Sequence, residues 1–266
     1  MTSTADSNPK TMTGALDPCP SLVTRICFEQ PCPDNPYNAQ KRLLQGYDLM
    51  ELWRDASYVD VLLLLFTGEL PQPQQRRFLE MLMVGLINPG PRHGAVRAAM
   101  LAGVSKTAPE HLLPLGLLTG SGEQGGALAV AASHAYLQSH LEEDPSVCAQ
   151  KCLSVGPAPG FGTHHGGPEP IWQQLGEDLT AAWPGSPVMN WCGIFAATLS
   201  KSGQGWLAPG LVAAAGLALN LGARESMGLY QLLIAPGVVA QGMEQTHRPI
   251  SSNPLLADDH YELVTP

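Results

Sequence analysis

The sequence predicts an all-α, closely packed fold. Apolar residues recur at helical spacing in Ala- and Leu-rich segments that Gly and Pro separate. No segment shows the sustained two-residue alternation of Val, Ile and Thr that is typical of strands. With 266 residues, of which 44% are hydrophobic, the chain can bury a substantial core.

The N-terminal 40 residues are rich in proline and lack periodicity, so we expect an irregular arm there. Ordered structure is predicted from about residue 46. Asp48 with Glu51, and Ser57 with Asp60, have the spacing of a capping box, which marks a helix start. The second pair predicts a helix over 59–66 that ends at Gly68.

Helical periodicity continues to the C-terminus, with a break at each Gly or Pro cluster. His134 and His140 are expected on an exposed helix face. The further predicted helices cover residues 73–87, 93–103, 108–119, 126–142, 146–154, 170–182, 188–201, 209–221 and 227–245.

Charge argues against a nucleic-acid partner, because 14 Lys and Arg face 23 Asp and Glu. Charged residues make up only 14% of the chain, against about 25% in an average soluble protein, which leaves an uncharged surface that a second copy could cover. Cys148 and Cys152 lack neighbouring ligands, so no metal site is expected. The apolar run at 207–223 is interrupted by Pro and Gly and is too short for a membrane span. We therefore expect a cytoplasmic protein with reduced thiols and no membrane partner.

Six short motifs carry a family resemblance because of their order. They are GYDL at 46–49, SYV at 57–59 with LLLLFTGELP at 62–71, GSGEQGGA at 120–127, PGFGTH at 159–164, PVMNW at 187–191, and APG at 235–237 with Glu244. From about residue 42 to the end, the chain resembles the citrate synthase family, including its shorter relatives, the citryl-CoA lyases.

The resemblance implies a mainly helical homodimer. A small domain at 127–232 would be inserted into a large domain at 41–126 plus 233–266, and the two would close over an acyl-CoA and a keto acid. The CoA thioester would be a substrate, and no covalently bound cofactor is expected. In such enzymes a carboxylate removes the α-proton of the thioester while a histidine stabilises the enolate oxygen. A second histidine polarises the keto carbonyl, and arginines bind the carboxylates.

This sequence departs from that pattern at the catalytic positions. Gln124 stands where the enolate-stabilising histidine is expected, and it can donate an N–H but cannot transfer a proton. Asn190 stands at the position of the basic carboxylate, and an amide is no general base near neutral pH. His93, beside Arg92, keeps the place of a substrate-contacting histidine. In the PGFGTH motif the histidine is either replaced by Thr163 or displaced to His164.

The resemblance thus predicts a pocket in which Gln124, Asn190 and His93 share one cleft. Each residue also has a plainer interpretation. His93 and Gln124 could cap helices, and Asn190 could cap or bridge helices. Glu123 could be either a substitute base or a solvated acid at a helix start. Glycines could serve ligand approach or tight helix packing. The predicted catalytic residues are His93, Gln124, His164 and Asn190; the predicted substrate-binding residues are Arg92, Glu123, Gly125, Gly126, Phe161, Gly162, Thr163 and His165.

Two arginines of the family pattern are also missing. Ile234 stands where the family usually has an arginine before Thr-Pro-Gly, and residues 166–170 contain none. A substrate with fewer carboxylates than citrate is therefore expected. Three classes of function remain open: a divergent enzyme that forms or breaks a carbon–carbon bond on a CoA thioester, an inactive protein that binds an acyl-CoA or small acid, and a structural subunit.

Overall fold

The computed structural model describes residues 24–163 and 166–252, together with residues 260, 262 and 264. The chain divides into two compact units, Met1–Arg54 and Asp55–Pro266, which we describe separately. The division into large and small domains predicted from the resemblance is a different one, and it stays a prediction.

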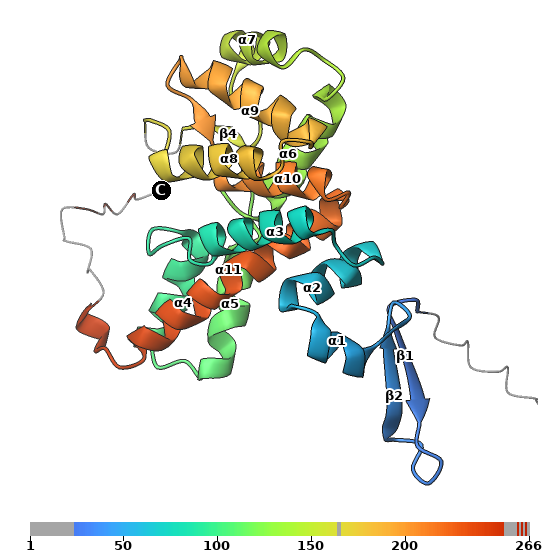
Figure 1. The fold of residues 1–266 in the computed structure, drawn as a ribbon. Coiled ribbons are helices and arrows are strands. Elements are labelled where there is room, and N and C mark those ends of the chain that lie inside the picture. The colour runs from blue at the N-terminus through green and yellow to red at the C-terminus, as the bar shows by residue number, and fades with distance from the viewer. Residues whose placement is uncertain (1–23, 164–165, 253–259, 261, 263, 265–266) are drawn as a thin grey trace, which may run out of the picture. The chain divides into compact units, whose positions relative to one another are not determined.

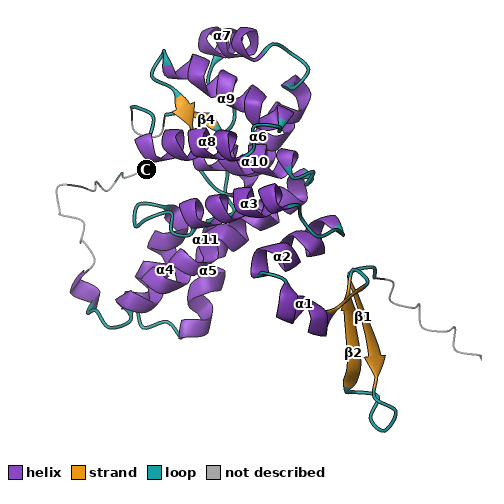
Figure 2. Cartoon of the chain, in the orientation of Figure 1, coloured by secondary structure: helices purple, strands orange, loops and turns teal. Residues whose placement is uncertain are grey.

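The fold is all-α, as the periodicity predicts, with short strands added (Figures 1 and 2). Predicted and observed helix ends agree to within a few residues, because Gly and Pro mark them. The described residues form α1 (Leu49–Asp55), α2 (Tyr58–Thr67), α3 (Pro73–Leu86), α4 (Gly94–Val104), α5 (Leu112–Thr119), α6 (Ala127–His140), α7 (Pro145–Val155), α8 (Pro170–Ala182), α9 (Pro187–Ser200), α10 (Ala208–Ala218) and α11 (Ala223–Gln245), with 3₁₀ turns at Pro109–His111 and Ile250–Ser252.

The N-terminal unit contains a sheet that the sequence pattern did not predict. Strands β1 (Cys27–Pro31), β2 (Ala39–Leu44) and β3 (Tyr47–Asp48) pair antiparallel in that order. Gln45 and Gly46 link β2 to β3 with φ of 49° and 89°, which is the two-residue turn that suits the twist of a hairpin. The expectation of an irregular arm is therefore wrong from residue 27 onward. The sequence pattern did not reveal these strands because they are mostly exposed and carry no apolar alternation.

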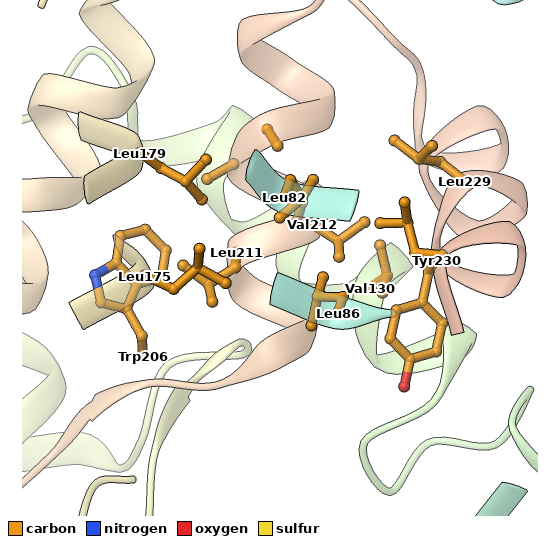
Figure 3. Close-up of a cluster of buried hydrophobic side chains, with 14 of the residues drawn as sticks. Leu82, Leu86, Val130, Leu175, Leu179, Trp206, Leu211, Val212, Leu229 and Tyr230 are labelled. Carbon is orange, nitrogen blue, oxygen red and sulfur yellow. The ribbon is translucent and has the colours of Figure 1, made fainter. Parts of the chain in front are cut away.

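The core of the second unit gathers around α10, where every residue from Pro209 to Gly216 is buried. Helix α10 packs on α6, α9 and α11, while α11 also packs on α4 and α5. Helices α7, α8 and α9 lie at one end of this unit, and α4 and α5 lie at the other (Figure 1). Figure 3 shows where side chains of α3, α6, α8, α10 and α11 meet, among them Leu82, Val130, Leu175, Val212 and Tyr230.

Helix α11 continues through Pro236, which cannot donate a backbone hydrogen bond. The N–H of the next residue, Gly237, donates instead to the carbonyl of Ile87, just past the end of α3, at 2.9 Å. A Cβ on Gly237 would lie 2.5 Å from that same oxygen. The Pro-Gly pair therefore fastens the long helix to the end of α3, and it does so close to the candidate site described below.

The capping box predicted at Ser57 is confirmed. The N–H of Ser57 donates to Oδ2 of Asp60 at 2.8 Å, and the N–H of Asp60 donates to Oγ of Ser57 at 3.2 Å. Asp60 is 2% exposed and also pairs with Arg76 of α3. Burial opposes ionisation of this carboxyl, but the hydrogen bonds from Ser57 and Arg76 outweigh it and lower the pKa of Asp60.

No helix among the described residues is both long and apolar enough to cross a membrane. Cys27, Cys32, Cys148, Cys152 and Cys192 are free thiols. The described part of the chain contains no cluster of three His, Cys, Asp or Glu side chains that could hold a metal ion.

We predict that Asp60→Asn lowers the free energy of unfolding by about 1–3 kcal/mol at pH 7, because the Arg76 guanidinium loses its buried partner. A carboxyl whose pKa is lowered by folding stabilises the protein above its unfolded pKa, and this contribution disappears as the pH falls through the folded value. Urea unfolding should therefore show a smaller acid-induced loss of stability below about pH 4 in Asp60→Asn than in the wild type.

Arg76→Ala removes the other member of the ion pair and should also lower the free energy of unfolding. Arg77→Ala, at the exposed neighbouring position, is its matched control. Equal stabilities of these two variants would contradict the importance given to the Asp60 ion pair.

Candidate functional site

His93 is both a helix cap and a residue that lines a cavity, the two interpretations that the sequence allowed. It is the N-cap of α4, where Nδ1 accepts a hydrogen bond from the N–H of Ala95 at 3.3 Å. Because Nδ1 is an acceptor, Nε2 carries the proton. Nε2 lies 3.0 Å from the Tyr230 hydroxyl and 3.5 Å from the carbonyl oxygen of Gly125. These contacts hold the imidazole in one orientation and one tautomer.

Tyr230 of α11 joins His93 to the turn that precedes α6. Its hydroxyl donates to the carbonyl of Gly125 at 2.7 Å, and the side chain is only 1% exposed. In Figure 3 this hydroxyl points away from the surrounding hydrophobic side chains. Burial raises the pKa of the Tyr230 phenol, which therefore stays protonated and remains a donor at neutral pH.

A cavity of about 380 Å³, which we call the His93 cavity, opens beside this junction. Four predicted site residues line it: Arg92, His93, Gln124 and Gly125. The other lining residues are Leu86, Pro89, Gly94, Glu169, Trp172, Ala208, Pro209, Tyr230 and Ile234.

A second cavity of about 700 Å³, the Gly160 cavity, shares Gln124, Gly125 and Pro209 with the first. Six predicted residues line it: Glu123, Gln124, Gly125, Phe161, Gly162 and Thr163. Its wall also includes Gln204, whose Oε1 is buried and has no hydrogen-bond donor among the described residues. Gln124 is exposed and lies where the two cavities meet, so its amide can contact ligands in either.

Close packing explains two of the glycines. Gly160 has φ of +82°, and a Cβ there would lie 2.6 Å from Cα of Gly210 on α10. Gly126 is buried, lines neither cavity, and would place a Cβ 2.5 Å from the carbonyl of Gly122. Phe161 likewise belongs to the core, edge-on to Phe195 with ring centroids 4.8 Å apart.

Asn190 lies outside the two cavities, so the expectation that it shares a cleft with Gln124 and His93 is not met. It is exposed on the first turn of α9, where its Nδ2 donates to the carbonyl of Pro184 at 2.8 Å. It lines a separate cavity of about 520 Å³ between α8 and α9. Its hydrogen bond joins the first turn of α9 to the loop that follows α8.

His164 and His165 lie outside the described residues. The sequence pattern missed Tyr230, Glu169, Trp172 and Gln204, which come from segments without a family motif. His134 was expected at the surface but is 3% exposed, with Nε2 2.9 Å from the carbonyl oxygen of Leu221. Alanine is spread around α6, so the sequence pattern does not show which side of this helix is buried.

Comparison with solved structures identifies the fold. The chain is similar to citryl-CoA lyase from Hydrogenobacter thermophilus, with a TM-score of 0.74 and 18% identity over 92% of this chain and 94% of that one. ATP citrate lyase from Methanothrix soehngenii, in complex with citrate and coenzyme A, matches with a TM-score of 0.71 and 16% identity. That match covers 95% of this chain and 44% of the lyase.

Citrate synthase from Thermoplasma acidophilum, in a ternary complex with carboxymethyl coenzyme A and oxaloacetate, matches with a TM-score of 0.60 and 13% identity over 79% of this chain and 58% of that one. The chain thus has a divergent citrate-synthase-like fold, as the motif order predicted. No family model and no curated protein matches its sequence.

We predict that Tyr230→Phe lowers the free energy of unfolding by about 1–3 kcal/mol, because the Gly125 carbonyl loses its closest donor inside the protein. Urea unfolding measures this loss, and the ring ¹⁵N shifts of His93 report whether its tautomer is still fixed. Tyr58→Phe, at a side chain 72% exposed, is the control. If the two variants are equally stable and the His93 shifts do not change, the junction does not hold the site together.

Proposed function

We propose that this chain is a divergent citrate-synthase-like enzyme that makes or breaks a carbon–carbon bond between a CoA thioester and a small keto acid. The observation that carries the proposal is the meeting of two cavities at Gln124 and Gly125, with the oriented His93 beside them. The likeness to structures that hold citrate with coenzyme A, or oxaloacetate with a coenzyme A analogue, supports the same ligand classes here.

In this proposal the thioester occupies the larger Gly160 cavity. A pantetheine chain carries amide N–H groups, and the buried Oε1 of Gln204 is an acceptor suited to one of them. Gln124 donates an N–H to the thioester oxygen as negative charge develops there. The acid occupies the His93 cavity, where the Arg92 guanidinium binds its carboxylate. His164, displaced by one from the family position, is proposed as a further catalytic residue, and its sequence neighbours Thr163 and His165 are proposed as substrate-binding residues.

Glu123 is the proposed base, because it lines the Gly160 cavity next to Gln124. In synthesis its carboxylate takes the α-proton from the thioester, the resulting enolate carbon attacks the keto carbonyl, and the protonated Glu123 returns this proton to the new alkoxide oxygen. In cleavage Glu123 takes the proton of the β-hydroxyl, the carbon–carbon bond breaks, and Glu123 returns the proton to the α-carbon of the enolate. His93 positions these groups, because its Nε2 is directed at Tyr230 rather than free to exchange a proton.

The position of Asn190 favours a second candidate, a protein that binds an acyl-CoA or small acid without turnover. Its amide is hydrogen-bonded to Pro184 and Asn190 lines another cavity, so position 190 supplies no base to a ligand bound where the two cavities meet. Removing a catalytic base commonly costs factors of about 10² to 10⁴ in rate, which a pocket retained for binding would tolerate.

We further propose a homodimer in the cytoplasm. Leu101 on α4 and Leu115 and Leu118 on α5 are 55%, 40% and 74% exposed, on helices that pack against each other. A second copy could cover this apolar surface, which suits a chain with so few charges. Sedimentation should then give twice the 28.2 kDa of one chain, and Leu118→Glu should shift it toward the monomer. A wild-type monomer at micromolar concentration would contradict this part of the proposal.

We predict that the protein exchanges the α-protons of acetyl-CoA or another short acyl-CoA with deuterium from D₂O, as mass spectrometry can measure. Glu123→Gln should slow the exchange by a factor of about 10² or more, because the base is lost. Glu110→Gln, at an exposed acid on the 3₁₀ turn before α5, should leave it unchanged. Thermal stabilisation by the ester should survive in Glu123→Gln, since binding does not need the base.

The two candidates differ in one result. Stabilisation by acyl-CoA without any exchange would favour the binding protein, and the absence of both would contradict each of them.

A comparison of Gln124→Ala with Asn190→Ala tests which amide belongs to the site. We predict that Gln124→Ala weakens acyl-CoA binding about fivefold to tenfold, the value of one lost hydrogen bond. Asn190→Ala should change it less than about twofold, because its amide faces a different cavity. Calorimetric titration measures both, and a larger effect at Asn190 would show that the ligand reaches α9.

A further inference from the structure

The described residues that line the His93 cavity include one charged side chain of each sign. Among its described lining residues, Arg92 is the one that carries a positive charge and Glu169 the one that carries a negative charge. Neither takes part in an ion pair with another described residue. The cavity can therefore neutralise one anionic group of a ligand, at Arg92.

Glu169 stands at the N-cap position of α8, yet its side chain makes no capping hydrogen bond. Glu169 is half-buried and lines the same cavity as Arg92. A ligand that brings a second carboxylate into this space would meet like charge, and repulsion between like charges is strongest where water is partly excluded.

The rest of the wall is largely apolar. Leu86 and Ile234 are fully buried and Trp172 is 9% exposed, and Pro89, Ala208 and Pro209 complete this side. Ile234 is on α11, one turn after the Tyr230 that orients His93. An apolar group of a ligand gains from burial against these side chains, whereas a charged group would lose its hydration there without a partner.

We propose that the acid bound in the His93 cavity is a 2-oxo monocarboxylic acid with an apolar substituent. Its carboxylate pairs with Arg92, its keto oxygen faces Gln124, and its alkyl or aryl group lies against Trp172, Pro89 and Ala208. This inference rests on the proposed function, because it names the class of acid that would react with the thioester. Glu169 is then a specificity-determining residue that disfavours dicarboxylates.

Calorimetric titration of the full chain with 2-oxoisovalerate and with oxaloacetate, at one pH and ionic strength, tests this inference. We expect 2-oxoisovalerate to bind at least about tenfold more tightly. Arg92→Gln should weaken that binding about tenfold or more, while Arg97→Gln, at an exposed position of α4 outside the cavity, should not.

Glu169→Gln should tighten oxaloacetate binding about fivefold or more and leave 2-oxoisovalerate within about twofold, because only the dicarboxylate meets the repulsion. Glu177→Gln, an exposed acid later in the same helix that lines the cavity of Asn190, is the control. Circular dichroism confirms that each variant is folded before it is titrated.

Oxaloacetate binding as tight as 2-oxoisovalerate, an Arg92→Gln variant with unchanged affinity, or no binding of either acid would overturn the inference. Its failure is distinguishable from failure of the proposed function. Selective binding of the monocarboxylate without any proton exchange from acyl-CoA would remove the reaction and keep the pocket. Proton exchange or bond formation that depends on oxaloacetate would keep the reaction and remove this choice of acid.

Discussion

The candidate site depends on the contacts that the Tyr230 hydroxyl makes with His93 and Gly125. This hydroxyl donates to the carbonyl of Gly125 and lies within hydrogen-bond distance of His93, so one buried oxygen joins the middle of α11, the turn before α6 and the start of α4. These three segments are far apart in the sequence. Because the phenol is buried and stays protonated in the neutral range, its hydroxyl remains a donor to Gly125 there. The contacts of this hydroxyl bring His93 and the turn that carries Gln124 together.

Close approaches between backbone segments shape the two cavities that meet near the Tyr230 hydroxyl. Gly160 lies against Gly210 at a separation that no side chain would permit, and this brings the loop before β4 (Phe161–Gly162) onto α10. The Pro236-Gly237 step fastens α11 to the end of α3 and holds Ile234 in the wall of the His93 cavity. Two close backbone approaches thus shape the space that a ligand would fill, while the lining side chains decide its chemistry.

The chemistry of that space differs from the family pattern in a consistent direction. An amide stands at 124 and an isoleucine at 234, and the positive charge in the His93 cavity comes from Arg92. Glu123 is the carboxylate that lines the Gly160 cavity, while Asn190 lines a separate cavity and hydrogen-bonds to Pro184. A site that keeps its hydrogen-bonding capacity while losing positive charge fits a less anionic acid better than it fits loss of all ligand binding.

The sequence by itself determined the helices, the fold and part of the site. Gly and Pro placed the helix ends, Ser57 with Asp60 marked a capping box, and the motif order identified the citrate-synthase-like fold, because these signals are local in the chain. His93, Gln124 and Gly125 were found through such motifs.

Only the tertiary structure separated Asn190 from them, buried His134, revealed the N-terminal sheet and brought Tyr230, Glu169 and Trp172 to the cavity. Those outcomes depend on which helix faces meet. Contacts between distant segments leave no periodic or local mark in a chain this rich in small apolar residues.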